Sequence, residues 1–442
     1  MPIGIIGMLA AIAVMIIGAY RGIKAIPLTL LAAVFVIVAN RMELWPSFAL
    51  VYGGGFGATI TRFFFIFISS AIYAMIMEKT GSTASIGFQM VKWFGTKHVM
   101  AVVFFFTAVL TYGGVSLFVV VFAAVPVAFV LFKEANLPRA AILAPMGAGG
   151  AGITMTTLPG TPSLTNIIPA QHLGTPLTAA PVFSIILAIL IVVLSLIYFD
   201  HVVKAVRKNN EAFTFPAGFD AASISVDRSK LPHPFKAFAP IVTLILFIVI
   251  STIARAPFAA DSALLTTLGM IIASLLCLIL NLKRVTPAAL KNWIGDGANN
   301  GITAIVGLAA VVAFGTVVSN APAFQSVLQW VLGLDLNVYF KGLVATGIIS
   351  GITGSSSGGA QIALSNLAEY FLASDANLEV LHRLIAMSAG TLDTLPHVSA
   401  IFVFLAVLGC THKEAYSYLF WPTVVIPTAV TILGVITASI IW

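Results

Sequence analysis

The chain has 442 residues, of which 60% are hydrophobic and 8% are charged, and its formal net charge is +7. Soluble proteins of this length carry roughly a quarter charged residues, so the composition excludes a soluble globular fold. Apolar runs long enough to cross a bilayer as helices recur along the whole chain, and they are continuous where a β-barrel would alternate. The composition therefore predicts an all-α polytopic membrane protein embedded in a lipid bilayer.

The expected spans divide into two sets on either side of one long polar segment. In chain order we expect spans near 3–19, 24–40, 57–78, 97–112, 115–132 and 178–199, and then near 237–254, 262–281, 301–319, 339–353, 358–372 and 415–441. A stretch rich in Gly and Pro precedes the last span of each set, at about 133–177 and 380–412. Each of these stretches is expected to contain a broken or re-entrant helix.

The same landmarks recur in the same order in both sets. Glu134-Ala135-Asn136-Leu137 returns as Asp375-Ala376-Asn377-Leu378, and Thr157-Leu158-Pro159 returns as Thr394-Leu395-Pro396. The glycines at 53–57 and 295–297 are further expected to open corresponding helices. Duplicated units that meet near the midplane are typical of secondary transporters. We therefore predict a first transmembrane repeat over 1–200, a cytoplasmic linker over 201–236 and a second repeat over 237–442.

The basic residues predict that the second repeat is inverted relative to the first. Lys and Arg favour the cytoplasmic side of short membrane loops, and many of them lie in the segment 201–236. With that segment inside, only five of the 22 basic residues are predicted to lie outside: Arg41, Arg62, Arg255, Lys341 and Arg383. Each repeat then crosses the membrane an odd number of times. Because the charge is explained by topology, no nucleic-acid partner is expected.

Four stretches are expected to leave the helical conformation inside the bilayer: 112–116, 157–166, 354–359 and 393–399. Such backbone persists only where it is buried in protein or lines a wet cavity. Helix N-termini at the breaks suit a carboxylate, and nearby hydroxyl and amide groups suit the ligand's hydroxyls. The alternative is that the small residues only let helices approach closely. The predicted substrate-binding residues are Gly113, Gly114, Ser116, Thr157, Thr161, Thr165, Asn166, Ser355, Ser356, Ser357, Thr394 and His397.

Among the acidic residues, Asp393 is the one that the sequence places between apolar segments, at the depth of the membrane interior. A carboxylate at the centre of a membrane helix costs about 2.5–3.5 kcal/mol on insertion scales, so its presence there usually marks function. His397 follows one helical turn later, and we predict that Asp393 and His397 handle a coupling proton. Alternatively, Asp393 caps the following half-helix and His397 is an ordinary satisfied polar residue. Arg62, near the outer end of its helix, is expected to extend towards the membrane surface.

At the broken stretches the sequence resembles the gluconate permease (GntP) family of the ion transporter superfamily. The resemblance covers nearly the whole chain and is clearest from Leu158-Pro159-Gly160-Thr161-Pro162 to Gly174, and from Gly354 through His397 to Gly409. It implies proton-coupled import of gluconate and related hydroxy acids in the bacterial cytoplasmic (inner) membrane. It also implies a homodimer in which a transport domain slides against a scaffold domain.

The chain departs from that family's motifs in ways that bear on the substrate. Gly114 stands where the family has an acidic residue, Gly160-Thr161 where it has a histidine, and Asp393-Thr394-Leu395-Pro396-His397 where it has Ser-His-x-Asn-Asp-Pro. A site with fewer charged groups favours a short hydroxy or keto monocarboxylate over gluconate itself.

A sodium/proton antiporter is the main alternative function. It would need membrane-embedded carboxylates, and the sequence offers one convincing case, Asp393. Sodium is also the alternative coupling ion, since backbone carbonyls at the breaks would suit it. The sequence carries no metal-ligand spacing, no phosphate-binding Gly-Lys motif and no set of nucleophile, base and orienting residue. We therefore expect neither a cofactor nor an enzymatic activity.

Overall fold

The computed structural model describes residues 2–21, 23, 25–94, 98–114, 117–215, 231–254, 256–396 and 398–442. Across these residues the chain forms helices joined by short connections, without a β-strand. The prediction of an all-α polytopic fold is confirmed.

The first half begins at the N-terminus and ends with a long helix. Its elements are α1 (Pro2–Tyr20), α2 (Ala25–Ala39), the run α3 (Leu44–Pro46), η1 (Ser47–Tyr52) and α4 (Gly53–Lys79), then α5 (Ser82–Phe94), α6 (Val99–Tyr112), α7 (Leu117–Glu134), the run η2 (Arg139–Ile142), α8 (Leu143–Gly147) and η3 (Ala148–Thr154), then α9 (Leu164–Leu173) and α10 (Pro181–Lys208).

The second half repeats this order of elements. It contains α11 (Pro234–Ile253), η6 (Pro257–Ala260), α12 (Ser262–Leu280), η7 (Leu282–Arg284), α13 (Pro287–Ser319), α14 (Pro322–Gly333), α15 (Val338–Thr353), α16 (Ser356–Leu372), α17 (Leu378–Ala389), α18 (Ser399–Leu408), and the run α19 (His412–Phe420), η8 (Trp421–Val425) and α20 (Ile426–Ile441).

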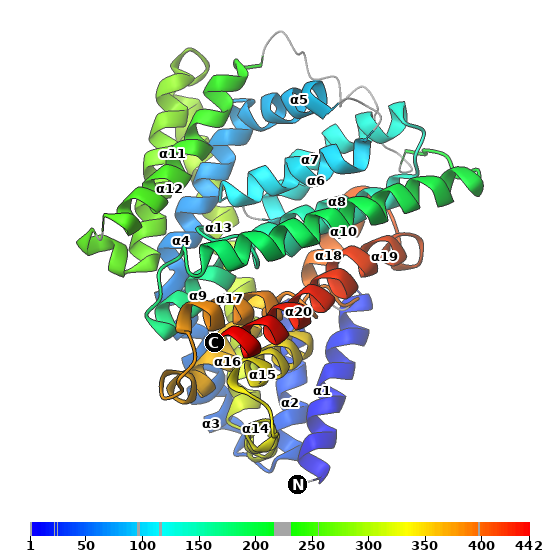
Figure 1. Ribbon diagram of the computed structural model, residues 1–442. Helices are drawn as coiled ribbons and strands as arrows, with labels where there is room; N and C mark the ends of the chain where they lie inside the picture. Colours follow the sequence, from blue (N-terminus) through cyan, green and yellow to red (C-terminus); the bar gives the residue numbers. More distant parts are fainter. Residues whose placement is uncertain are drawn as a thin grey trace.

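The packing of the halves follows the same correspondence. Helices α1 and α2 form a pair, as do α11 and α12; α2 packs on α13, and α12 packs on the equivalent helix α4. The two long helices α4 and α13 lie against each other. The short helices α5 and α14 lie at opposite ends of the molecule, with α14 near the N-terminus (Figure 1). Equivalent elements at opposite ends give the halves opposite orientations.

Two boundaries differ from the expectations. Helix α10 continues to Lys208, so the start of the segment 201–236 is helical. The glycines at 295–297 do not open a helix, because α13 already begins at Pro287, where the Thr286 side chain caps it. A Cβ on Gly297 would lie 2.8 Å from Cα of Ile72 in α4. This glycine therefore permits the close approach of the two long helices.

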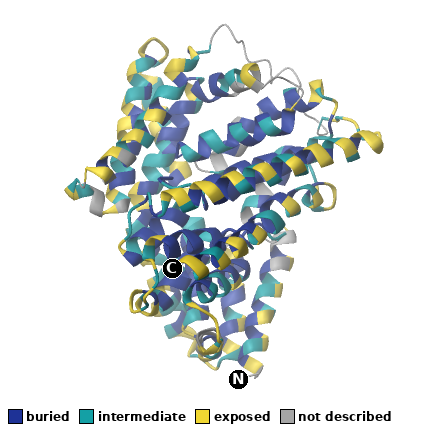
Figure 2. Cartoon of the chain, viewed as in Figure 1, coloured by how far each residue is buried: buried dark blue, intermediate teal, exposed yellow. Residues whose placement is uncertain are grey.

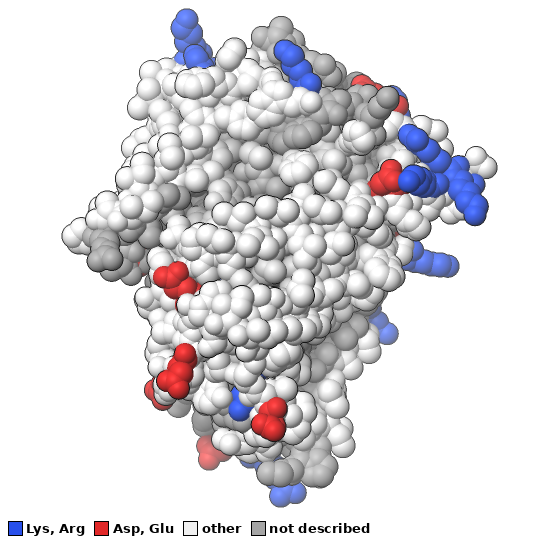
Figure 3. Space-filling model, viewed as in Figure 1, with Lys and Arg blue, Asp and Glu red and all other residues white. Residues whose placement is uncertain are grey.

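The surface of the molecule is suited to lipid. In the part of the chain that the structure describes, five helical runs are long and apolar enough to cross a membrane. One face of α10 exposes apolar side chains along its length (Figure 2), namely Val182, Ile185, Ile186, Ile189, Val193 and Ile197. On the face drawn in Figure 3, Lys and Arg gather mainly at the upper end and the right edge, where α10 ends, and a wide uncharged region lies between the ends. An apolar belt between charged ends is the pattern expected of a multi-pass membrane protein.

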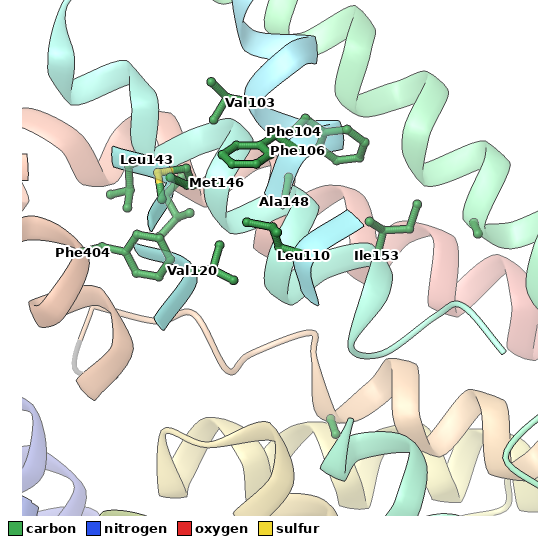
Figure 4. Packing of buried hydrophobic residues seen from close by; sticks show 14 of the residues in the cluster. Val103, Phe104, Phe106, Leu110, Val120, Leu143, Met146, Ala148, Ile153 and Phe404 are labelled. Atoms are coloured by element: carbon green, nitrogen blue, oxygen red, sulfur yellow. The ribbon is translucent and has the colours of Figure 1, made fainter. Parts of the chain in front are cut away.

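Buried apolar side chains join the two halves. Figure 4 shows Phe104 and Leu110 of α6, Leu143 and Met146 of α8, and Phe404 of α18 in one cluster. Because α18 belongs to the second half, this core holds the broken segment of each half against the other.

Candidate functional site

The first break lies between η3 and α9, at residues 155–163. The carbonyl of Met155 accepts hydrogen bonds from the hydroxyls of Ser163, at 2.6 Å, and of Thr165. The Tyr112 hydroxyl donates to the carbonyl of Pro159 at 2.7 Å. Side chains thus replace the helical partners that the broken backbone has lost, as an interior break requires.

The second break lies between α17 and α18, at residues 390–398. The Tyr416 hydroxyl donates to the carbonyl of Thr394 at 3.2 Å, and the Thr394 hydroxyl donates to the Thr423 hydroxyl at 2.8 Å. Asp393 is 8% exposed, and its carboxylate accepts a hydrogen bond from the side chain of Ser356, at the first position of α16. The buried carboxylate therefore connects two of the predicted breaks.

The breaks of the two halves touch each other. Gly390, at the end of α17, lies directly against Thr156, and a Cβ added at Gly390 would be 2.6 Å from Cγ2 of Thr156. Helix α9 of the first half packs on α16 and α17 of the second. The two duplicated segments thus come together in one region of the interior.

A buried hydrogen-bond network fixes α9 to α17. The amide nitrogen of Asn166 donates to the carbonyls of Thr161 and Leu177 at 2.8 and 2.9 Å, so its oxygen is the acceptor facing Nε2 of His382 at 2.9 Å. His382 therefore carries its proton on Nε2, and Nδ1 accepts from the Thr175 hydroxyl at 2.6 Å. Every member of this network has a partner, which favours one rigid arrangement.

Arg383, the next residue of α17, is 0% exposed. Its Nη1 donates to the carbonyl of Leu158 at 3.3 Å, and its Nη2 to those of Leu177 and Ala179 at 3.5 and 3.3 Å. Its Nε is buried and has no hydrogen-bond acceptor among the described residues. An arginine of the second half thus contacts the first break, at Leu158, and the connection between α9 and α10, at Leu177 and Ala179. Charge alone assigned Arg383 to the outer side of the membrane, whereas the structure buries its side chain inside the protein.

A second polar cluster joins the long helix α4 to α9 and α16. Arg62 Nε donates to the Gln171 side chain at 2.6 Å, while its Nη1 lies 3.2 Å from Nε2 of His172 and 3.3 Å from the Gln361 oxygen. The Gln361 amide nitrogen also lies 3.1 Å from Nε2 of His172. Both neighbours are donors, so Nε2 of His172 accepts. Arg62 is therefore bound within the protein, contrary to the expectation that it extends to the membrane surface.

Several of the predicted site residues come together at the two breaks. Thr161 and Asn166 are fully buried, and the Thr161 hydroxyl has no partner among the described residues. Asn166 links the Thr161 carbonyl to His382 and to the Leu177 carbonyl that Arg383 also contacts. Thr157 is buried, and its hydroxyl lies 3.4 Å from both the Gly152 carbonyl and the Thr156 hydroxyl. Around the start of α16, Ser355 accepts from the backbone N–H of Gly358, and its hydroxyl lies 3.5 Å from that of Ser357.

Other predicted residues lie elsewhere or cannot be placed. Gly113 packs against Ile241 of α11, and Gly114 against Met270 of α12. This placement matches the alternative in which small residues permit close helix approach. Ser116 and His397 lie outside the described residues.

Comparison with known proteins bears on the family and the fold. No model of a known protein family matches the chain. The chain is 30% identical over 457 residues to the uncharacterized transporter YxjC of Bacillus subtilis (strain 168), and the match covers 96% of each sequence. The chain belongs to the YxjC transporter family.

Two solved transporter structures share the fold. The YdaH transporter of Alcanivorax borkumensis superposes with a TM-score of 0.61 at 14% identity, covering 90% of each chain. MtrF of Neisseria gonorrhoeae, described as one of a class of antimetabolite efflux pumps, superposes with a TM-score of 0.56 at 15% identity, covering 90% of this chain and 84% of that one. The chain is thus a multi-pass membrane transporter. Membership in the gluconate permease family stays a prediction.

Sequence reasoning missed Arg383, His382 and the Arg62 cluster. A signal was available in the sequence. His382 and Arg383 adjoin the apolar run Leu384-Ile385-Ala386 just before the second break, in the strongly amphipathic helix α17. A charged residue next to a predicted re-entrant segment is a functional candidate for the same reason as Asp393, because charges inside the membrane are costly and usually functional.

Proposed function

We propose that the chain is a secondary active transporter that imports a small organic acid, driven by proton symport, through alternating access. The observation that carries the proposal is the contact between two broken segments contributed by halves of opposite orientation, at Gly390 and Thr156. Inverted halves supply two related conformations in which such a site opens to one side or the other.

The chemistry of the breaks favours an acid as the substrate. Hydroxyl groups of Thr161 and Ser356 and the guanidinium of Arg383 lie at these segments, and all of them are donors that suit a carboxylate or a hydroxyl. Asp393 is the one carboxylate at either break. The resemblance to gluconate permeases supports this choice of substrate class, and the departures from their motifs favour a short hydroxy or keto monocarboxylate.

Asp393 is the proposed proton carrier. A buried carboxylate held by one hydroxyl loses little when it accepts a proton, because the neutral form is the better suited to an apolar interior. We further propose that the first break and α17 move as one body against α4 and α13, in an elevator-type motion, within a homodimer in the bacterial cytoplasmic (inner) membrane. The network from Asn166 to His382 would hold that body together.

Uptake by proteoliposomes tests the proposal. Labelled gluconate, glycerate, 3-hydroxybutyrate, lactate and citrate are each offered with an imposed proton gradient and, separately, with a sodium gradient. Accumulation of at least one acid under the proton gradient is the expected result. If no acid moves and a sodium gradient drives proton flux instead, the protein is an antiporter and the proposal is wrong.

A further inference from the structure

The buried guanidinium of Arg383 has no anionic partner in the part of the chain that the structure describes. The ion pairs found there are Lys79–Glu78 and Lys204–Asp200, and neither involves Arg383. An arginine keeps its charge even when buried, and an uncompensated charge in the interior is strongly unfavourable. Its position against the first break therefore calls for an explanation beyond packing.

The existing contacts of Arg383 compensate its charge poorly. Its three bonds to backbone carbonyls measure 3.3 to 3.5 Å, whereas N–H···O hydrogen bonds in proteins usually measure about 2.7–3.2 Å. If the only role of Arg383 were to hold the backbone at Leu158 and Ala179 in place, its hydrogen bonds to those carbonyls would be expected to be shorter. The Nε–H group makes none within the described chain.

A second unpartnered polar group lies on the first break itself. The Thr161 hydroxyl is fully buried and without a partner among the described residues, three positions beyond the Leu158 carbonyl that Arg383 contacts. Buried polar groups in native proteins nearly always have partners. Other buried groups without one occur elsewhere among the described residues, the Tyr73 hydroxyl for example, but Arg383 Nε and the Thr161 hydroxyl both lie beside the first break, and their position there points to a missing ligand. The donors available, an N–H of a guanidinium and a hydroxyl, suit a carboxylate.

We propose that Arg383 is the counter-charge for the carboxylate of the transported acid, with the Thr161 hydroxyl as a second donor. This assignment rests on the proposed function, and it adds that the substrate is recognised as an anion at the first break, by a residue of the second half. It places Arg383 on the substrate and leaves Asp393 to the proton.

The first test uses the unaltered protein and compares an acid with its neutral isostere. Uptake of the acid that the proteoliposome panel identifies is competed with unlabelled acid and with the matching primary amide, for example lactate against lactamide. Loss of a charge-assisted bond predicts that the amide competes at least about tenfold less well. Equal competition by acid and amide overturns the proposal without any variant.

The second test asks whether Arg383 is the source of that selectivity. In Arg383→Gln the ratio of acid to amide affinity is expected to fall at least about tenfold, and in Arg383→Lys the preference for the acid persists at reduced affinity. The matched control is Arg139→Gln, because Arg139 also donates to a carbonyl of the opposite half, that of Gly409 at 3.0 Å. Arg139 is partly exposed and is not assigned to substrate, so its variant keeps the wild-type ratio.

The outcomes separate this inference from the proposed function. If wild-type protein neither takes up nor binds any acid, the proposed function fails. If wild-type protein prefers the acid and Arg383→Gln keeps the same preference, only the role of Arg383 is wrong. A purely structural arginine would lower both affinities together and leave their ratio unchanged. If Arg383→Gln does not fold, Arg383→Lys decides: the proposal requires a lower affinity for the acid and an unchanged affinity for the amide, and an unchanged affinity for the acid overturns it.

Discussion

Nε2 of His382 lies 2.9 Å from the amide oxygen of Asn166, and this single hydrogen bond joins helices from opposite halves of the chain. Asn166 belongs to α9 beside the first break, and His382 belongs to α17 just before the second. Both side chains are fully buried. The two breaks are therefore held in register by a polar contact between the duplicated units.

Replacing His382 with Ala should destabilise the protein. The change leaves the Asn166 oxygen and the Thr175 hydroxyl without their partners and opens a cavity, which together cost about 2–4 kcal/mol. Thermal unfolding of the purified protein in detergent measures the loss. His201→Ala is the control, because His201 is exposed on α10, and equal stability of the two variants would contradict the role of the network.

Gly390→Ala should impair transport through a steric conflict with Thr156. The new methyl group would stand 2.6 Å from Cγ2 of Thr156, and overpacking of this kind costs about 1–3 kcal/mol. Thr156→Ser in the same chain removes Cγ2 and is expected to restore uptake and thermal stability. Gly295→Ala is the control, since a Cβ there meets nothing within 4 Å. Failure of the double variant to recover would mean that the breaks do not meet here.

Asp393→Asn should abolish accumulation of the acid under a proton gradient while leaving counterflow exchange intact. The amide keeps the shape and the Ser356 contact but does not carry the proton. Uptake with an imposed gradient and exchange without one are measured on the same proteoliposomes. Asp335→Asn, at an exposed position, serves as the control. Full accumulation by Asp393→Asn would remove Asp393 from the coupling mechanism.

Arg62→Gln should loosen α9 from α4. The shorter neutral side chain loses the bonds to Gln171 and His172, and amide hydrogen exchange in residues 164–173 is expected to rise about two- to fivefold. Exchange measured by mass spectrometry on the protein in nanodiscs checks this. Lys291→Gln, on an exposed position of α13, should leave exchange in that segment unchanged. Unaltered exchange in Arg62→Gln would show that the cluster does not restrain α9.

In the conformation that opens the site to water, cysteines placed at Thr161 and Ser356 should react with a thiol reagent, and the same transported acid should protect both. The two positions lie on breaks of different halves that share one site in the proposed function. A cysteine at Ala212, in an exposed segment, provides the reference rate. The partly exposed Cys410 is replaced by Ser in every variant, and the buried Cys277 is kept. Protection of one position without the other would mean that the breaks belong to separate sites.

The class and the order of elements were predictable from the sequence. Apolar runs long enough to cross the membrane predict an all-α fold. Lipid offers no hydrogen-bond partners, so the backbone N–H and C=O groups of each run must bond to one another, as they do in a helix. The duplicated motifs predicted corresponding breaks at Thr157-Leu158-Pro159 and Thr394-Leu395-Pro396, and the structure has an interruption between helices at each. These predictions depend on residues that are close together in the sequence, so a single sequence is enough to make them.

Tertiary structure decided which polar groups meet at those breaks. Counting charges along the chain assigned Arg383 to the outer surface, since that method treats each basic residue as free to reach water. In the folded protein, carbonyls of Leu158, Leu177 and Ala179, more than 200 positions away, surround its guanidinium. Likewise, Gly297 was expected to help open a helix, whereas it lies inside α13 and permits the close approach of Ile72 in α4. Sequence by itself determined where the backbone breaks, and only the packing of one half on the other determined what fills the breaks, because those partners come from distant parts of the chain.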